Sequence, residues 1–293
     1  MVSKPIVCQA NFNALAKMVS NASLQRIIFD EDFKRYGKQI KSLLKKSGLE
    51  LQNKCTFREL LQHSYDHLSI NYRHEYLYKT ALLNSYILRN YSLSDTILLN
   101  EFKIGSSKAD CVLVNGTNKV FEIKTELDNP DRLNSQLNDY YKAFSEVYIV
   151  IHCSSIDKYV QLLNPKVGIM IFKDNSIEVF RTATYDQSKL ETVTMMKALR
   201  KEEYLQIVKK LTGNVPSVQP VFLFKACLDI VSNYAVDEIQ SEFLKVIKQR
   251  INHRLNEFIS ASEIPDMLRH SCYHSNMNQN EYLSLIKRLS ISL

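Results

Sequence analysis

Hydrophobic positions recur with a helical period in the first third of the chain. Ile40 begins an amphipathic pattern, and Gly48 ends it where a helix C-cap glycine would lie. A second helix is expected to begin after Thr56, because Glu59 follows three residues on, as in a capping box. The next segment, 73–88, is apolar on nearly every side, which predicts a buried helix.

In the middle of the chain the period of the apolar positions changes. Strands are expected over 96–104, 109–114, 119–125, 147–151, 167–172 and 177–180. Asn115-Gly116 is a turn signal, so the second and third strands should form a hairpin. A helix over 131–144 follows them, and the unbroken apolar run 147–151 is typical of a central strand covered on both faces. This order predicts an α/β protein with a mixed sheet core of the form α-β-β-β-α-β.

The rest of the chain returns to a helical pattern. Its clearest helices are expected over 202–211, 221–233, 236–251 and 280–291. The sequence therefore predicts three parts: an N-terminal helical extension over 1–70, an α/β core over 71–183, and a C-terminal helical region over 184–293.

Composition narrows the class of protein. The chain has 293 residues, 45% hydrophobic and 24% charged, which excludes collagen-like, disordered and disulfide-stapled small proteins. Its formal net charge of +7 is compatible with a partner that carries phosphates, but it is too small to require such a partner. The six cysteines are dispersed with no Cys-x-x-Cys, and no apolar run is long enough to span a bilayer. We therefore expect a cytoplasmic protein with no membrane partner.

Two neighbouring predicted strands contain charged residues at positions where a buried sheet would ordinarily have apolar side chains. Side chains alternate along a strand, so Phe121 and Ile123 should anchor one face of the third strand. Glu122 and Lys124 then share the other face, and Asp110 is the one charge in the apolar strand before them. Burying such groups costs several kcal/mol unless they are paired or bind an ion. Two adjacent carboxylates repel each other, and Mg²⁺ or Mn²⁺, which prefer oxygen ligands, would relieve that repulsion.

Asp110 in one strand and Glu122-x-Lys124 in the next resemble the PD-(D/E)XK nuclease superfamily, which has the restriction-endonuclease-like fold. The resemblance implies that Asp110 and Glu122 bind the metal, together with the backbone carbonyl of Ile123. It implies that Lys124 is the catalytic lysine and that Glu75, in the preceding helix, is a further catalytic acid. The cofactor implied is Mg²⁺ or Mn²⁺.

The helix after the third strand extends the resemblance. Gln136 and Tyr140 are four residues apart and share one helical face. A Gln-x-x-x-Tyr helix after Glu-x-Lys is similar to the RecB-like branch, where both side chains line the active site and contact DNA or the catalytic groups. An Asp-x-x-x-Arg motif that ends at Arg132 is similar to a poorly characterised bacterial and phage family within the superfamily. The resemblance covers 73–182, and Lys108 and Arg132 are expected to contact nucleic acid as well.

Less specific interpretations of the same residues stay open. Glu122 and Lys124 would alternate in this way on any solvated strand face. A first-turn carboxylate such as Glu75 is favoured by the helix dipole alone. The Pro in the superfamily's name is Ala109 in this chain.

The function expected from the sequence is that of a metal-dependent nuclease that hydrolyses phosphodiester bonds, in DNA rather than RNA. Genome defence, repair or mobile-element biology fit by resemblance, with nucleic acid as the partner and room for a homodimer or a protein partner. One alternative is a catalytically inactive nucleic-acid-binding module of the same fold. Another is a regulator that acts through its C-terminal helices.

Overall fold

The computed structural model describes residues 9–51, 53–250, 259, 263–275 and 277–293, and their contacts divide the chain into two compact units. The helical unit takes its described residues from 1–90, 174–177 and 252–293, and the sheet unit from 91–173 and 178–251. This division follows other boundaries than the three predicted parts, because the last helices pack on the first ones whereas 184–250 packs with the sheet. The predicted three-part division stays a prediction.

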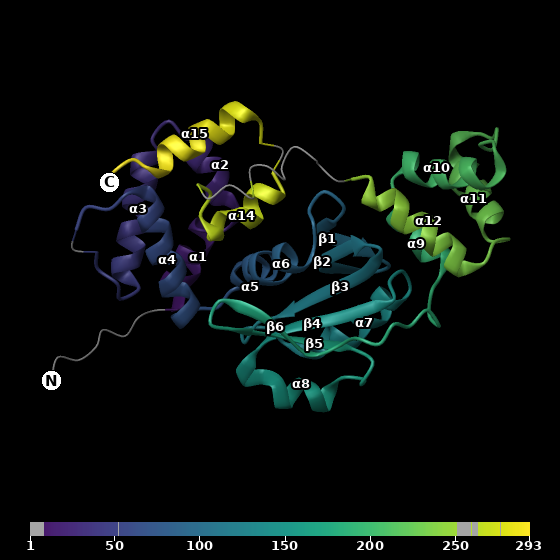
Figure 1. Cartoon of the computed structure of the whole chain (residues 1–293), viewed down its shortest axis with the longest axis horizontal. Coiled ribbons are helices and arrows are strands. Elements are labelled where there is room, and N and C mark those ends of the chain that lie inside the picture. Colours follow the sequence, from purple (N-terminus) through teal and green to yellow (C-terminus); the bar gives the residue numbers. More distant parts are fainter. Residues whose placement is uncertain (1–8, 52, 251–258, 260–262, 276) are drawn as a thin grey trace. The chain divides into compact units, whose positions relative to one another are not determined.

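The helical unit is built from short amphipathic helices. They are α1 (Gln9–Met18), α2 (Asn21–Phe29), α3 (Phe33–Lys46), α4 (Phe57–Asn71), α5 (Glu75–Ala81), the π-helical η1 (Leu82–Ile87), α6 (Leu88–Asn90), α14 (Asp266–Tyr273) and α15 (Gln279–Leu289). Figure 1 shows α14 and α15, in yellow, packed on the N-terminal helices, and both contact α2.

Three predictions for this unit are confirmed. Thr56 and Glu59 form a reciprocal capping box at the start of α4. Gly48 follows α3 with a φ of +97°, as a helix C-cap glycine does. The apolar segment predicted over 73–88 is helical from Glu75 onward and largely buried, although a π-helical turn interrupts it at Leu82–Ile87.

The sheet unit carries a six-stranded mixed sheet, as the sequence predicts for an α/β protein. The strands are β1 (Ile97–Ile104), β2 (Ser107–Asn115), β3 (Thr117–Lys124), β4 (Glu146–His152), β5 (Gly168–Lys173) and β6 (Ser176–Arg181), and they lie in that order. The pairs β1–β2 and β2–β3 are antiparallel, whereas β3–β4 and β4–β5 are parallel. The predicted turn at Asn115-Gly116 joins β2 to β3, with φ +61° at Gly116. Strand β4 is buried along nearly its whole length, which confirms it as central.

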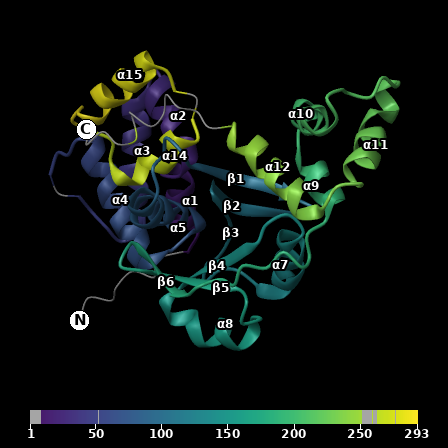
Figure 2. The same cartoon turned by 45° about the vertical axis from the view of Figure 1, so that its right-hand side comes forward.

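Helices cover one face of this sheet. The 3₁₀-helix η2 (Pro130–Arg132) leads into α7 (Leu133–Tyr141), which contacts β2 and β4 along that face (Figure 2). The hydrophobic core between them includes Tyr140 and Phe144 from the α7 segment and Ile149 from β4. The opposite sheet face carries Phe121 stacked on Tyr148, which confirms the alternation predicted for β3.

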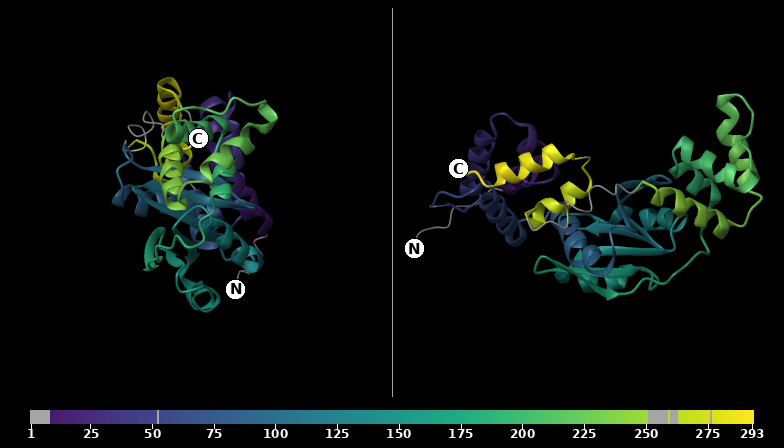
Figure 3. Two further views of the ribbon diagram at one scale, coloured as in Figure 1. Left: turned by 90° about the vertical axis from the view of Figure 1, so that its right-hand side faces the viewer. Right: turned by 45° about the horizontal axis from the view of Figure 1, so that its top comes forward.

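The remaining helices of the sheet unit complete the core. They are the 3₁₀-helix η3 (Cys153–Ser155), α8 (Ile156–Leu162), α9 (Thr192–Ala198), α10 (Lys201–Thr212), α11 (Pro220–Val231) and α12 (Val236–Lys248). The green helices α9–α12 gather beside the sheet (Figure 3), where α9 contacts β1 and α12 contacts β2. Helix α8 connects the parallel strands β4 and β5, a connection that commonly contains a helix. The sequence of this segment has no clear helical periodicity, so α8 was not predicted. Within the described part of the chain, no helix combines the length and apolar character needed to cross a membrane.

Candidate functional site

A buried carboxylate at the end of β3 forms the centre of a hydrogen-bond network. Glu122 is 2% exposed. Its Oε1 atom accepts hydrogen bonds from Lys124 Nζ at 2.8 Å and from Gln136 Nε2 at 2.6 Å. Its Oε2 atom accepts one from the Tyr140 hydroxyl at 2.5 Å. The four residues that the sequence singled out on β3 and on the following helix therefore lie in direct contact.

The side chains around Glu122 also form hydrogen bonds with one another. Lys124 Nζ donates a second hydrogen bond to Gln136 Oε1 at 3.0 Å, so the Gln136 amide touches both members of the ion pair. The side chains of Lys124 and Glu122 are only 10% and 3% exposed. A buried pair of this kind is tolerable only when its remaining hydrogen-bonding groups are satisfied, and Gln136 and Tyr140 satisfy them.

Asp110 lies beside this network on β2. The backbone pairing of β2 with β3 begins at Cys111 and Phe121, and just beyond it Asp110 Oδ2 accepts the backbone N–H of Ile123 at 2.6 Å. Burial first, and then the carboxylates of Glu122 and Asp110, raise the pKa of Tyr140 well above its ordinary value. Both carboxylates therefore raise the pKa of the same phenol. The Tyr140 hydroxyl stays protonated at neutral pH and serves as a hydrogen-bond donor.

Sequence reasoning missed Glu101 as a candidate site residue. Glu101 lies in β1 between the registered pairs Asn100–Cys111 and Phe102–Ala109, and so stands opposite Asp110. One of its carboxylate oxygens is within 4.8 Å of an Asp110 carboxylate oxygen. Glu101 also has a φ of +54°, which is uncommon for a residue with a side chain. Only the register of the β1–β2 hairpin reveals this pairing, since Glu101 carries no motif of its own.

Two predicted nucleic-acid contacts lie at the surface of the same unit. The side chain of Lys108 is 61% exposed and forms an ion pair with Glu101, while its carbonyl accepts a hydrogen bond from the Tyr140 hydroxyl at 3.2 Å. Arg132 is exposed at the end of η2, one helical turn before Gln136. The guanidinium and ammonium groups are thus accessible, and their contact with nucleic acid stays a prediction.

Glu75 belongs to the helical unit. It begins α5, its side chain is 49% exposed, and its carboxylate pairs with Lys79 Nζ at 2.5 Å. This is the position of the first-turn carboxylate that the helix dipole favours. Its predicted role beside Asp110 stays a prediction, because the two residues lie in different units.

A second polar anchor fixes α7 against the β1–β2 turn. Asp139 Oδ2 accepts hydrogen bonds from the backbone N–H of Ser106 at 3.1 Å and from the hydroxyls of Ser106 and Ser107 at 2.8 and 2.7 Å. Burial opposes ionisation of Asp139, but these hydroxyls and Lys142 outweigh it and hold the pKa of the carboxyl below its ordinary value. Because Tyr140 is the next residue, this anchor also sets where the Tyr140 ring enters the sheet face.

The oxygen ligands on β1, near the start of β2 and at the end of β3 suit a hard divalent cation. Glu101 and Asp110 place carboxylate oxygens within 4.8 Å of one another, and the neighbouring strand β3 adds the Glu122 carboxylate and the Ile123 backbone carbonyl. Mg²⁺ and Mn²⁺ take such oxygen ligands, whereas zinc prefers histidine and cysteine, which this set lacks. The residues present therefore fit the cofactor that the sequence resemblance implies.

Comparison with known proteins places the chain in a phage family. Protein cII of Enterobacteria phage P4 is 26% identical over 221 residues, which make up 73% of this chain and 79% of that protein. A solved structure of a protein of unknown function from Silicibacter pomeroyi matches with a TM-score of 0.30 and 14% identity, over 47% of this chain and 92% of that one, and this likeness is too low to carry an argument. A family model described as bacteriophage P4 protein cII matches residues 68–280, which include the whole Glu122 network. Because that match spans well over half of the sequence, the chain belongs to the bacteriophage P4 cII protein family.

Proposed function

We propose that the protein is a metal-dependent nuclease that hydrolyses phosphodiester bonds in DNA. The observation that carries the proposal is the buried Glu122 carboxylate, held by Lys124, Gln136 and Tyr140 beside Asp110. The resemblance of these residues to the PD-(D/E)XK superfamily supports the same activity.

Each side chain has a role that its contacts explain. Asp110 and Glu122, with the Ile123 carbonyl, would hold Mg²⁺ or Mn²⁺, which supplies a water of lowered pKa and polarises a phosphoryl oxygen. Lys124 brings a positive charge to the same place, where negative charge develops on phosphate during hydrolysis.

The α7 side chains position these groups. Gln136 holds the Lys124 ammonium at 3.0 Å, and Tyr140 fixes the Glu122 carboxylate from its other oxygen. Such support orients a site without taking part in the bond changes.

The test is a cleavage assay with linear, circular and single-stranded DNA in Mg²⁺, Mn²⁺ or EDTA. The wild type should cut only with metal, and Lys124→Ala should lower the rate by ~100-fold or more. Lys119→Ala is the matched control, because Lys119 lies on the same strand and its Nζ pairs with buried Glu146 at 2.5 Å. Lys119→Ala removes a buried ion pair of the same kind that lies outside the Glu122 network. The cleavage rate of this variant should therefore stay near that of the wild type. Cutting that persists in EDTA, or in Lys124→Ala, would contradict the proposal.

A catalytically inactive DNA-binding module is the second candidate. It is favoured by one observation: both oxygens of Glu122 already accept hydrogen bonds from protein donors, as in a purely structural network. In that case the wild type would bind DNA equally well in EDTA and would cut none of the substrates.

A further inference from the structure

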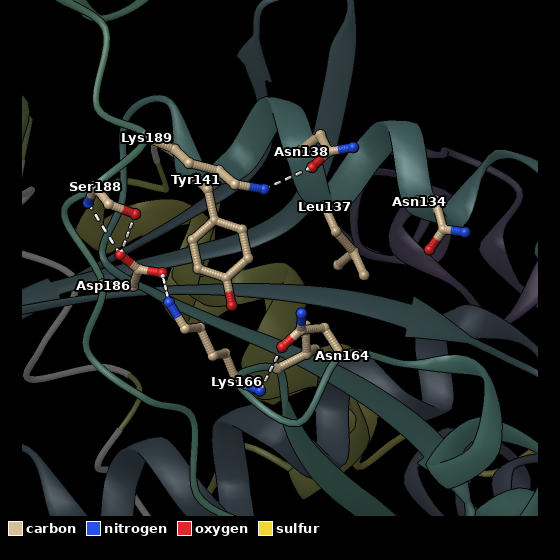
Figure 4. A pocket seen from close by; sticks show the side chains of 10 residues that line it. Asn134, Leu137, Asn138, Tyr141, Asn164, Lys166, Asp186, Ser188 and Lys189 are labelled. Carbon is tan, nitrogen blue, oxygen red and sulfur yellow. Dashed lines mark hydrogen bonds and ion pairs between the residues drawn. The ribbon is translucent and has the colours of Figure 1, made fainter.

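The flank of α7 that faces away from Glu122 borders a separate cavity of about 230 Å³ in the sheet unit (Figure 4). Asn134, Asn138 and Tyr141 line it from α7, at the spacing of one helical face. Asn164 and Lys166 line it from the segment before β5, and Asp186 and Lys189 from the segment after β6. The cavity is smaller than a typical drug-sized pocket of about 300–1,000 Å³, but holds far more than one water at about 30 Å³.

One buried donor in this cavity lacks an acceptor. Tyr141 is 7% exposed, and its hydroxyl is buried without a hydrogen-bond partner. Figure 4 shows the hydroxyl aimed into the cavity, between the side chains of Lys166 and Asn164. Burial first, and then the Asp186 carboxylate, raise the pKa of Tyr141 to about 12, so the hydroxyl keeps its proton. A buried hydroxyl with no partner destabilises the fold, and an acceptor on a ligand would offset that cost.

The charges around the hydroxyl favour an anion. Lys166 Nζ pairs with Asp186 Oδ2 at 2.6 Å, while Asp186 Oδ1 accepts hydrogen bonds from the backbone N–H and the hydroxyl of Ser188. Among the residues that the structure describes, Lys189 forms no ion pair; its Nζ is held by Asn138 Oδ1 at 3.1 Å, over the Tyr141 ring. The cavity therefore holds the Lys166–Asp186 ion pair and, in addition, the Lys189 ammonium, so that its lining carries a net positive charge.

We propose that this cavity binds a phosphate group. Its donors are the Tyr141 hydroxyl, the two lysine ammonium groups and the side-chain amides of the asparagines, and a phosphate supplies several acceptor oxygens to match them. Two carriers share that chemistry, a terminal phosphate of a nucleic-acid strand and a free mononucleotide. The proposal does not depend on catalysis at Glu122, because none of the residues of that network lines the cavity.

The test is calorimetric titration of the full chain with inorganic phosphate, a nucleoside 5′-monophosphate, and one oligonucleotide with and without a 5′-phosphate. Tyr141→Phe and Lys189→Gln should each weaken phosphate binding by about tenfold. Lys201→Gln is the control, because Lys201 carries the same charge, is exposed at the start of α10 and lies outside the cavity.

The outcomes separate the carriers and decide the proposal. Binding of the small phosphates alone assigns a free ligand, and a preference for the 5′-phosphorylated oligonucleotide assigns a strand end. Absence of phosphate binding, or an affinity that neither variant changes, would overturn the proposal. Unfolding curves of Tyr141→Phe guard against misfolding, since removal of an unpartnered hydroxyl should leave the fold at least as stable.

Discussion

The Tyr140 hydroxyl donates a hydrogen bond to Glu122 Oε2 across 2.5 Å, and the two residues are 0% and 2% exposed. Helix α7 thus brings a neutral donor onto a carboxylate that the sheet buries. Because burial and two carboxylates raise the pKa of the phenol, the donor persists through the whole neutral range of pH. The Glu122 carboxylate is therefore fixed by the packing of α7 as much as by its own strand.

Removal of this donor should destabilise the protein. Tyr140→Phe leaves Glu122 Oε2 buried without its partner, which should cost ~1–3 kcal/mol in the free energy of unfolding. The adjacent Tyr141→Phe provides the matched control, since the same atom is lost from a hydroxyl that has no partner. Urea unfolding should show a loss for Tyr140→Phe and none for Tyr141→Phe. Equal stability of the two variants would mean that the 2.5 Å contact contributes nothing.

Much of this site follows from local patterns in the sequence. Strand alternation places Glu122 and Lys124 on one face, and helical spacing places Gln136 and Tyr140 on one face, so their meeting requires only that the helix cover that face. The capping box at Thr56 and the turn at Asn115-Gly116 are equally local, and both are found.

Features that depend on distant contacts were not predictable in the same way. Glu101 faces Asp110 only through hairpin register, and the cavity at Tyr141 needs three segments that are far apart in sequence. The last helices join the N-terminal ones, a long-range association that no periodicity encodes. The π-helical turn at Leu82–Ile87 likewise reflects packing, because the apolar pattern there is that of an uninterrupted helix.

Glu101 should contribute to metal affinity if the site binds a cation. Glu101→Gln removes one charged oxygen donor near Asp110, so half-maximal cleavage should require about tenfold more Mg²⁺. Glu178→Gln is the control, because Glu178 is an exposed glutamate on β6 of the sheet unit. A metal titration of cleavage compares the two. If Glu178→Gln shifts the curve as far as Glu101→Gln does, the effect is one of general charge and Glu101 has no place in the site.

Buried histidines should make the helical unit sensitive to acid. Burial lowers the pKa of the His74 imidazole to about 4. Burial first, and then the charges of His274 and Lys79, also lower the pKa of His270. The unfolded chain takes up these protons near pH 6.5, whereas the folded chain does not. The stability contributed by these two histidines, His74 and His270, is therefore fully present above pH 6.5 and falls as the pH drops toward 4, by ~1.4 kcal/mol per pH unit for each of them.

His74→Phe tests this pH dependence with little change in packing. The His74 ring stacks between Tyr72 and Tyr76 at centroid distances of 6.2 Å on both sides, and a phenyl ring can take the same place. Urea midpoints at pH 7.5 and pH 5 should differ less in His74→Phe than in the wild type. His63→Gln, at an exposed position, should keep the full pH dependence. A wild type whose midpoint does not move between these pH values would contradict the prediction.

Substitutions at two turn glycines distinguish the cost of backbone strain from the cost of a steric clash with α7. Gly105 and Gly116 have nearly the same φ, +60° and +61°, which costs ~1–2 kcal/mol for a residue with a Cβ. A Cβ on Gly116 would meet nothing within 4 Å, whereas on Gly105 it would lie 3.0 Å from the Asp139 carboxyl. Gly105→Ala should therefore lower the free energy of unfolding by more than Gly116→Ala does, because it also disturbs the anchor between Asp139 and the serines of the β1–β2 turn. Urea unfolding of both variants measures the difference. Equal losses would show that Asp139 can move away at no cost and that this anchor does not hold α7 in place.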